Sequence, residues 1–274
     1  MNYRHAYHAG NFADVLKHAC LIVSLSQILQ KPAAAFFLDT HAGRGRYDLT
    51  GEEAQRAQEW RGGVGRVLGG GDVNPALSGY AEAVRGDLAA DAYPGSPLLL
   101  ARFARPVDRV IAYEAHPEEF APLQAHLASF AQARAVQGDG FTALKALLPP
   151  PERRGLVLID PPFEANDERQ RLCRAMEAAL RRWETGQYLI WLPIKSYDET
   201  RAVYDALAAM TGRPIISLEL QIGRARSDGR LNACCMIAIN PAFALAQAAP
   251  RLVVVCAAQM ADNVGPMGRV VTIR

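Results

Sequence analysis

Residues 160–163 read Asp-Pro-Pro-Phe and follow directly on the apolar run "GLVLI". Asp160 precedes a proline and is therefore restricted to extended backbone, while Pro161 and the proline after it stiffen the turn. Such a rigid turn can aim a carboxylate and a neighbouring backbone carbonyl at the two N–H donors of one exocyclic amino group. Phe163 adds an aromatic face for an unstacked base, a contact worth roughly 1 to 3 kcal/mol. The turn suits chemistry on the N6 atom of an adenine, whether or not Asp160 itself accepts the proton.

Three other apolar runs end in residues that suit an adenosine. The first leads into "LDTHAGRG", where His41 lies in the turn and Gly43 permits close backbone approach. Glu114 ends the second run and can accept hydrogen bonds from both hydroxyls of a ribose. Asp139 follows the third and can accept from an adenine amino group, while Gly140 leaves room for the ring. Each is also typical of an ordinary turn or helix cap, but together, in chain order, they outline a nucleoside site.

An N-terminal helix is predicted over residues 12–29, capped by Asn11 and carrying Asp14 in its first turn. Residues three or four apart share one face of a helix, so Asn11, Asp14 and His18 form a polar stripe on an apolar helix. That stripe needs a polar partner, and a cofactor carboxylate or amine would serve, with Lys17 close by. The alternative for His18 is a hydrogen-bonded histidine of the core.

The formal net charge of the chain is only +2, so any binding of nucleic acid must depend on local patches. The stretch that begins with Tyr3 and Arg4 is aromatic and basic and can stack on and pair with RNA, unless it is a simple flexible terminus. Arginine-rich stretches are also typical of a solvated surface. They comprise Arg44 with Arg46, Arg153 with Arg154, the group Arg169, Arg171 and Arg174, and the loop with Arg224, Arg226 and Arg230.

The elements that must position these residues alternate between strands and helices, as in a doubly wound α/β sheet. The last two strand candidates flank a turn-rich loop, which predicts an antiparallel hairpin. Five parallel strands and a closing hairpin suit a methyltransferase-type Rossmann sheet, and the lack of a full GxGxxG disfavours a dehydrogenase. The predicted strands occupy residues 34–39, 109–114, 133–138, 155–160, 187–193, 215–223 and 232–240.

At 274 residues and 50% hydrophobic content, the chain is expected to form one domain, residues 1–274, with a helical insertion at about 48–94 that serves either as a lid or as decoration. No apolar stretch reaches the length of a membrane span, and the N-terminus lacks the features of a secretory signal. The five cysteines show no CxxC spacing and the histidines no metal-ligand spacing. A cytoplasmic, metal-free monomer with reduced thiols is the expectation.

The motifs "YRHAYHAGNFADVLKH", "LDTHAGRGRYDL", "YPGSPLL", "YEAHP", "GDGF" and "LIDPPFE" resemble, in this order, the RlmJ family of bacterial 23S ribosomal RNA adenine-N6 methyltransferases. The resemblance spans about residues 2–241. It implies a class I, Rossmann-like domain with a helical insertion, S-adenosylmethionine as cofactor and 23S ribosomal RNA as partner. By resemblance, Asp160 borders the cofactor and acts as catalytic acid or base, and Tyr3 contacts the RNA. The cofactor-binding residues implied are His18, His41, Ser96, Glu114, Asp139 and Gly140.

Two departures and two alternatives remain at this point. Phe163 stands where the family commonly has tyrosine, which keeps the stacking face, and the segment after Pro241 matches only loosely. The Asp-Pro-Pro-Phe turn suits a DNA adenine-N6 methyltransferase equally well, so only the resemblance favours RNA. A non-catalytic RNA-binding module of ribosome assembly that retains a cofactor pocket is the alternative of another class.

Overall fold

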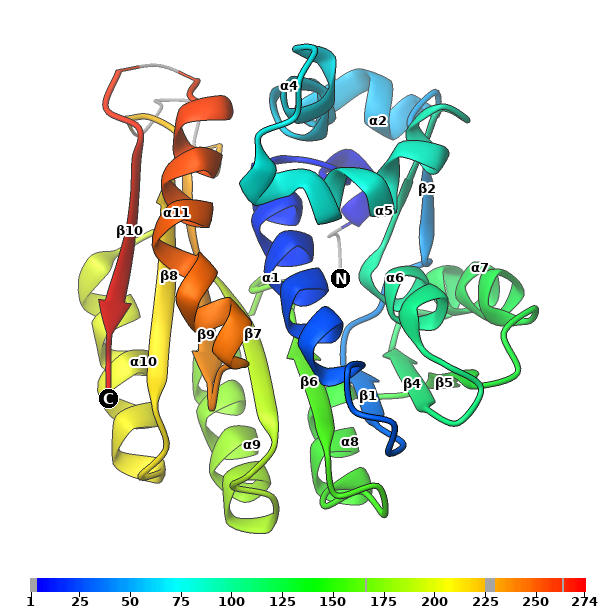
Figure 1. Cartoon of the computed structure of the whole chain (residues 1–274), viewed down its shortest axis with the longest axis vertical. Coiled ribbons are helices and arrows are strands. Elements are labelled where there is room, and N and C mark those ends of the chain that lie inside the picture. The colour runs from blue at the N-terminus through cyan, green and yellow to red at the C-terminus, as the bar shows by residue number, and fades with distance from the viewer. Residues whose placement is uncertain (1–3, 166, 225–229, 263) are drawn as a thin grey trace.

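The computed structural model describes residues 4–165, 167–224, 230–262 and 264–274. Its centre is an eight-stranded sheet with the order β10-β8-β9-β7-β6-β1-β4-β5 (Figure 1). The seven strands predicted from the sequence all form. The strands are β1 (Phe36–Asp39), β4 (Arg109–Glu114), β5 (Ala133–Gln137), β6 (Gly155–Ile159), β7 (Gln187–Pro193), β8 (Ile215–Gln221), β9 (Ala233–Ile239) and β10 (Met267–Thr272).

The topology is that of a class I methyltransferase sheet. Strands β5, β4, β1, β6 and β7 are parallel neighbours, and β9 inserts antiparallel between β7 and β8. The hairpin predicted at the end of the chain is therefore confirmed. Because β1 lies between β4 and β6, the carboxyl ends of the central strands meet at one edge of the sheet, where ligands bind in open α/β folds.

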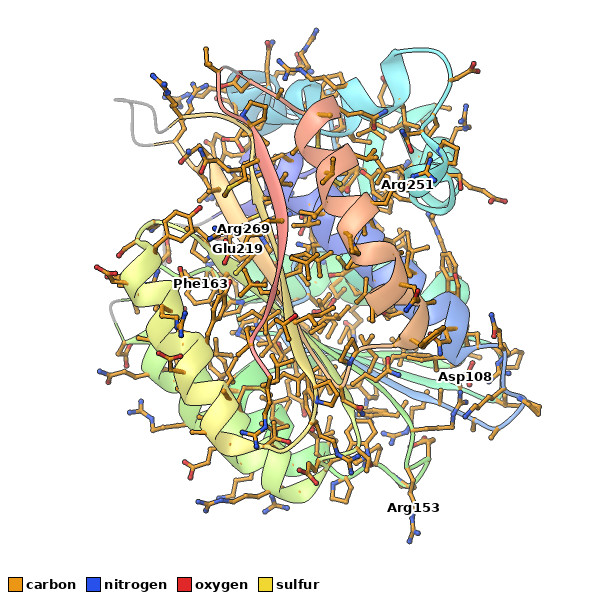
Figure 2. All side chains as sticks on the ribbon, turned by 60° about the vertical axis from the view of Figure 1, so that its left-hand side comes forward. Asp108, Arg153, Phe163, Glu219, Arg251 and Arg269 are labelled. Atoms are coloured by element: carbon orange, nitrogen blue, oxygen red, sulfur yellow. The ribbon has the colours of Figure 1, made fainter. Side chains whose placement is uncertain are left out.

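The eighth strand, β10, corrects the prediction of seven. It pairs antiparallel with β8 along the outer edge, and its Arg269 lies beside Glu219 of β8 at an N–O distance of 2.6 Å (Figure 2). Its residues are only half buried or exposed, as suits an edge strand. A short run with little apolar contrast gives a weak strand signal, which is why the sequence did not reveal it.

Helices cover both faces of the sheet because successive strand residues point to opposite sides. Leu156 and Leu158 of β6 pack with α1, α5, α6 and α11, whereas Val157 and Ile159 pack with α8, α9 and α10 (Figure 1). Cys234 and Cys235, which are neighbours on β9, divide between the same two cores. The helices are α1 (Phe12–Ile28), α6 (Ser96–Phe103), α7 (Pro117–Leu127), α8 (Gly140–Leu147), α9 (Glu168–Arg182), α10 (Tyr197–Met210) and α11 (Phe243–Gln259).

Between β1 and α6, the chain forms a helical region above the carboxyl ends of the strands (Figure 1). Tyr80 of α5 and Val64 of α4 join the core of α1, so this region is packed onto the N-terminal helix. β2 and β3 form a two-stranded antiparallel sheet within it. Its elements are β2 (Arg46–Asp48), α2 (Glu52–Ala57), α3 (Glu59–Gly62), α4 (Val64–Gly69), η2 (Pro75–Leu77), α5 (Ser78–Leu88) and β3 (Ala92–Pro94).

Among the helices of the described residues, none has both the length and the apolar character needed to cross a bilayer.

Candidate active site

A cavity of about 600 Å³ lies at the carboxyl ends of β1, β4, β6 and β7, between α1 and the turn that follows β6. Most residues predicted for the site line it. Arg4, Asp139 and Gly140 are not among the lining residues, and Tyr3 lies outside the described residues. The predicted residues that line the cavity are His18, His41, Gly43, Ser96, Glu114, Asp160, Pro161 and Phe163.

Asp160, directly after β6, is held by an ammonium group from α1. Lys17 Nζ lies 2.6 Å from Asp160 Oδ2 and 2.7 Å from Asp14 Oδ1, and Lys17 and Asp14 are almost completely buried. Burial alone lowers the pKa of Lys17, but the two carboxylates outweigh it and raise the pKa well above its usual value. Asp160 Oδ1 has no hydrogen-bond partner among the described residues. One carboxylate oxygen therefore remains available to a group in the cavity.

Asp14 is fixed from several sides at the start of α1. Its Oδ2 accepts hydrogen bonds from the Gly10 backbone N–H at 2.8 Å and faces His5 Nε2 at 2.9 Å. Burial raises the pKa of Asp14, but His5 and Lys17 outweigh burial and hold the pKa well below its usual value. The predicted cap is confirmed, because the Asn11 side chain accepts from the first backbone N–H groups of α1. The polar stripe of this helix lines the cavity.

The turn that carries Asp160 ends in a residue with unusual backbone. Phe163 has φ of 50°, in the left-handed region that non-glycine residues rarely adopt at a cost of about 1 to 3 kcal/mol. Its ring is 9% exposed, 6.0 Å from the Trp191 ring of β7, and Arg169 approaches the ring to 5.9 Å. The ring packs against Trp191, and Phe163 is one of the residues that line the cavity.

Glu114, at the end of β4, is anchored to two loops. Its Oε2 accepts from the Gly43 N–H at 2.8 Å and its Oε1 from the His116 N–H at 2.7 Å. Burial raises the pKa of Glu114. Each oxygen keeps a second lone pair for a ligand hydroxyl. Gly43 has φ of 61°, which lets the β1 turn bring its N–H to this carboxylate without a side chain.

His41 follows β1 and presents an acceptor to the cavity. The Thr40 hydroxyl lies 3.1 Å from the Leu158 carbonyl and 2.8 Å from His41 Nδ1. We assign the hydroxyl proton to the carbonyl, so that His41 Nδ1 carries the ring proton and donates to Thr40 Oγ1. Burial lowers the pKa of His41 to about 4, which keeps the ring neutral. Its Nε2 is therefore an acceptor. Phe141 meets the ring edge-on at 5.0 Å.

Ser96 begins α6 and reaches the last residue of β1. Its hydroxyl donates to Asp39 Oδ2 at 2.6 Å, and both residues are buried. Burial raises the pKa of Asp39 to about 7, although the Ser96 hydrogen bond favours the ionised form. Ser96 thereby lines the cavity from a position fixed by its partner.

His18 lies on α1 next to Lys17 but faces the helical region. Its Nδ1 is 2.8 Å from the Tyr93 hydroxyl, and the two rings are stacked at 5.5 Å. The Tyr93 hydroxyl lies 3.1 Å from that of Tyr80. Burial lowers the pKa of His18 to about 3. Its Nε2 is buried without a hydrogen-bond partner among the described residues, the kind of atom a bound ligand satisfies.

Asp139 and Gly140 lie at the end of β5 and start of α8. Asp139 Oδ1 accepts from the Phe141 N–H at 2.9 Å, and Oδ2 pairs with Arg171 at 3.0 Å. A Cβ on Gly140 would lie 1.8 Å from the Thr40 carbonyl oxygen, so this glycine lets α8 approach the end of β1. Cofactor contacts for both residues stay a prediction, alongside the cap and packing contacts that they make.

Most of the arginine-rich stretches have protein partners. Arg44 binds Glu119 in a bidentate pair, and Arg46 binds the buried Asp87. Arg153 lies at the end of the molecule opposite the helical region (Figure 2). Lys195, at the cavity rim after β7, is exposed and has no ion pair among the described residues. Arg226 falls outside the described residues.

Within the described residues, no three His, Cys, Asp or Glu side chains are grouped as metal ligands.

Two features of the site escaped the sequence analysis. Lys17 was noted only as a neighbour of the polar stripe, but it is the ion-pair partner of Asp160, which is 143 residues away in the chain. Tyr80 and Tyr93 were not recognised, although Tyr93 falls within the motif "YPGSPLL". No periodicity connects residues so distant in sequence. A lysine beside Asp14 on an otherwise apolar helix was the one local signal.

Comparison with known proteins identifies relatives across most of the chain. Residues 32–272 match the family model described as Ribosomal RNA large subunit methyltransferase D, RlmJ. A Haemophilus influenzae protein named Ribosomal RNA large subunit methyltransferase J is 37% identical over 89% of this chain and 89% of its own. The Escherichia coli protein of the same name is 36% identical over 90% and 89%, respectively. The crystal structure of protein LPL1258 from Legionella pneumophila matches with a TM-score of 0.87 at 28% identity, covering 97% of this chain and 98% of that one.

Proposed function

Because this chain belongs to the RlmJ family of large-subunit ribosomal RNA methyltransferases, we propose that it methylates the N6 atom of an adenine in 23S ribosomal RNA. The observation that carries the proposal is the Asp160 carboxylate at the cavity, with Oδ2 held by Lys17 and Oδ1 available. The methyl donor proposed is S-adenosylmethionine, which supplies an electrophilic methyl group on a sulfonium.

The polar groups of the cavity fit that cofactor. Glu114 offers lone pairs to the ribose hydroxyls from a position set by two backbone N–H groups. His18 Nε2 is a buried polar atom in need of a partner, and His41 Nε2 is an acceptor. Gly43, two residues after His41, leaves this position of the turn after β1 without a side chain. These features support a nucleoside with a polar amino acid tail.

The Asp160 turn would orient the target base. Asp160 Oδ1 and a backbone carbonyl of the same turn can each accept one N–H of the N6 amino group, which helps the nitrogen present its lone pair as it attacks. Lys17 contributes by keeping Oδ2 engaged, so that the carboxylate has one orientation. Phe163 lines the cavity and would contact a base removed from its stack. The proton leaves N6 after transfer, to solvent or through Asp160.

RNA is preferred over DNA as the substrate because of the named relatives and the family, not because of the turn itself. Lys195 at the cavity rim supports binding of a phosphate backbone near the site. Contacts of Tyr3 and Arg4 with RNA belong to the same proposal. Arg4 lies 3.6 Å from Glu53 and 3.8 Å from Glu118, exposed pairs that RNA phosphates can replace. A cytoplasmic monomer acting on 23S ribosomal RNA remains our expectation.

The test is transfer from S-adenosylmethionine to unmodified, deproteinised 23S RNA, with nucleoside analysis for N6-methyladenosine. We expect product from the wild type and at least about a hundredfold less from Asp160→Ala, with cofactor binding retained. Asp205→Ala is the matched control, since that carboxylate is exposed and, in the part of the chain that the structure describes, pairs only with Arg201 on α10.

Ribosomal subunits and duplex DNA serve as parallel substrates. Product on DNA alone would favour a DNA methyltransferase. Binding of RNA without product on any substrate would favour the non-catalytic module.

A further inference from the structure

Three buried polar side chains run in a line from the cavity wall into the helical region. His18, Tyr93 and Tyr80 are 1%, 0% and 2% exposed, and their polar atoms are joined by distances of 2.8 Å and 3.1 Å. His18 lines the cavity and the tyrosines lie behind it. Because Nδ1 of His18 faces Tyr93, the unpartnered Nε2 is the ring atom left for a group in the cavity.

The number of protons available limits the direction in which the hydrogen bonds between Tyr80, Tyr93 and His18 can run. Each hydroxyl has one proton, and a neutral imidazole has one N–H and one acceptor nitrogen. If Tyr80 donates to Tyr93, then Tyr93 donates to His18 Nδ1, and the His18 proton lies on Nε2. If the line runs the other way, His18 Nδ1 donates to Tyr93, Tyr93 donates to Tyr80, and the Tyr80 proton needs an acceptor.

No such acceptor exists for Tyr80 among the described residues, since Tyr93 is its one hydrogen-bond partner there. A buried donor left without an acceptor costs about 1 to 3 kcal/mol. In the first direction every hydroxyl proton is accepted and only the Nε2–H remains, at the cavity. Each direction leaves one proton without a protein acceptor among the described residues, but the first places it on His18 Nε2 at the cavity, where a bound group can accept it, whereas the second leaves it on Tyr80 in the core. The first direction is therefore favoured when the cavity holds an acceptor.

We propose that Tyr80 and Tyr93 are positioning residues that fix the proton of His18 on Nε2, so that Nε2–H donates to the carboxylate of the cofactor's amino acid part. The choice of ligand rests on the proposed function, whereas the direction of the hydrogen-bond line requires only an acceptor in the cavity. The low pKa of His18, about 3 because of burial, agrees with a neutral ring that carries a single proton.

The surrounding charges favour a carboxylate at this point rather than the cofactor's amine. Lys17, the neighbouring buried cation, has two carboxylates of its own at 2.6 and 2.7 Å. The His41 ring presents an acceptor. His18 Nε2–H is then a buried donor that is not already committed, and its polarisation through two hydroxyls strengthens it as a donor.

The direction can be measured in the free protein by the ¹⁵N chemical shifts of the imidazole nitrogens, with the His18 signals assigned by their loss in His18→Gln. We expect the wild type to carry the proton on Nε2 with Nδ1 accepting a hydrogen bond. Tyr80→Phe removes the bias, and the Nδ1–H form then becomes detectable. A wild-type His18 protonated on Nδ1 would overturn the proposal.

The ligand is tested by calorimetry with S-adenosylhomocysteine, its decarboxylated analogue and its deaminated analogue. Tyr93→Phe is expected to weaken binding of the first and third about fivefold, or ~1 kcal/mol, and to leave the decarboxylated analogue within about twofold. Tyr188→Phe is the matched control, because its hydroxyl is buried and donates to Trp183 far from the cavity lining.

Three outcomes of the calorimetry distinguish a carboxylate at His18 from an amine and from the absence of cofactor binding. Loss confined to the two ligands that carry a carboxylate supports the assignment. Loss confined to the two that carry an amine reverses the direction and overturns it. If the wild type binds none of the three, the proposed cofactor and the carboxylate assignment both fail, and the imidazole shifts alone decide the role of the tyrosines.

Discussion

Lys17→Met tests the electrostatic arrangement on which the site depends. Methionine keeps the length and apolar stem of lysine but removes the ammonium group. The side chains of Lys17, Asp14 and Asp160 are 6%, 2% and 16% exposed. Removing one partner of a buried ion pair costs about 3 to 5 kcal/mol of stability. Part of this loss is offset in Lys17→Met, because the variant no longer has to remove an ammonium group from water. We expect the free energy of unfolding to fall by about 3 kcal/mol at pH 8.

The same variant has a predicted pH dependence. In the wild type, Asp14 has a depressed pKa, so its stabilisation is present above its ordinary value of 3.8 and is lost as the pH falls below it. Without Lys17, burial is opposed mainly by His5, so the pKa of Asp14 rises and its ionised form becomes less favourable. The difference between wild type and variant should therefore shrink as the pH is lowered from about 8 to about 5.

Urea unfolding at several pH values measures both effects, with Lys145→Met as the matched control. Lys145 is exposed near the end of α8 and has no ion pair among the described residues, so its replacement should change stability by less than about 0.5 kcal/mol. A loss below about 1 kcal/mol for Lys17→Met, or a loss independent of pH, would refute the reasoning.

Two further predictions concern the ends of β1 and β5. Gly140→Ala places a Cβ 1.8 Å from the Thr40 carbonyl oxygen, so we expect a loss of at least about 2 kcal/mol in urea unfolding, whereas Gly86→Ala, with no atom within 4 Å, should be neutral or stabilising. Asp39 has a pKa raised to about 7, so the wild type loses stability as the pH rises from about 4 to about 7, because the carboxyl ionises in the unfolded chain but stays protonated in the folded one. Asp39→Asn should make the free energy of unfolding nearly independent of pH in that range and raise it at pH 8 by on the order of 2 kcal/mol. An unchanged pH profile would show that Asp39 does not cause the loss of stability.

The strands and their ends were predictable because the signals are local. "GLVLI" and "RVIAYE" are short apolar runs followed by an acid, and each forms a parallel strand that delivers its acid to the same edge of the sheet. The helix after Asn11 was predictable from its cap. In contrast, β10 is held at an edge by pairs such as Arg269 with Glu219, 50 residues apart, which no local pattern encodes.

The contacts between site residues were also out of reach, for the same reason. Asp160 was identified from two prolines beside it, but its partner Lys17 comes from the other end of the chain. His18 was identified by family resemblance, while the tyrosines behind it follow 62 to 75 residues later on separate elements. Spacing predicts which residues reach one edge of a sheet, but not which of them meet there.

The helical region between β1 and α6 contributes a wall of the site rather than a loose cover. Its Tyr80 and Tyr93 are buried against α1, their hydroxyls bond to each other, and the Tyr93 hydroxyl also bonds to His18. Lifting the region away would expose two tyrosines and break both hydrogen bonds, a change that a small ligand would have to offset. Lys17 and His18 are neighbours on α1, and one holds the Asp160 turn while the other meets the tyrosines. The helix therefore links the Asp160 turn to the helical region through two adjacent residues.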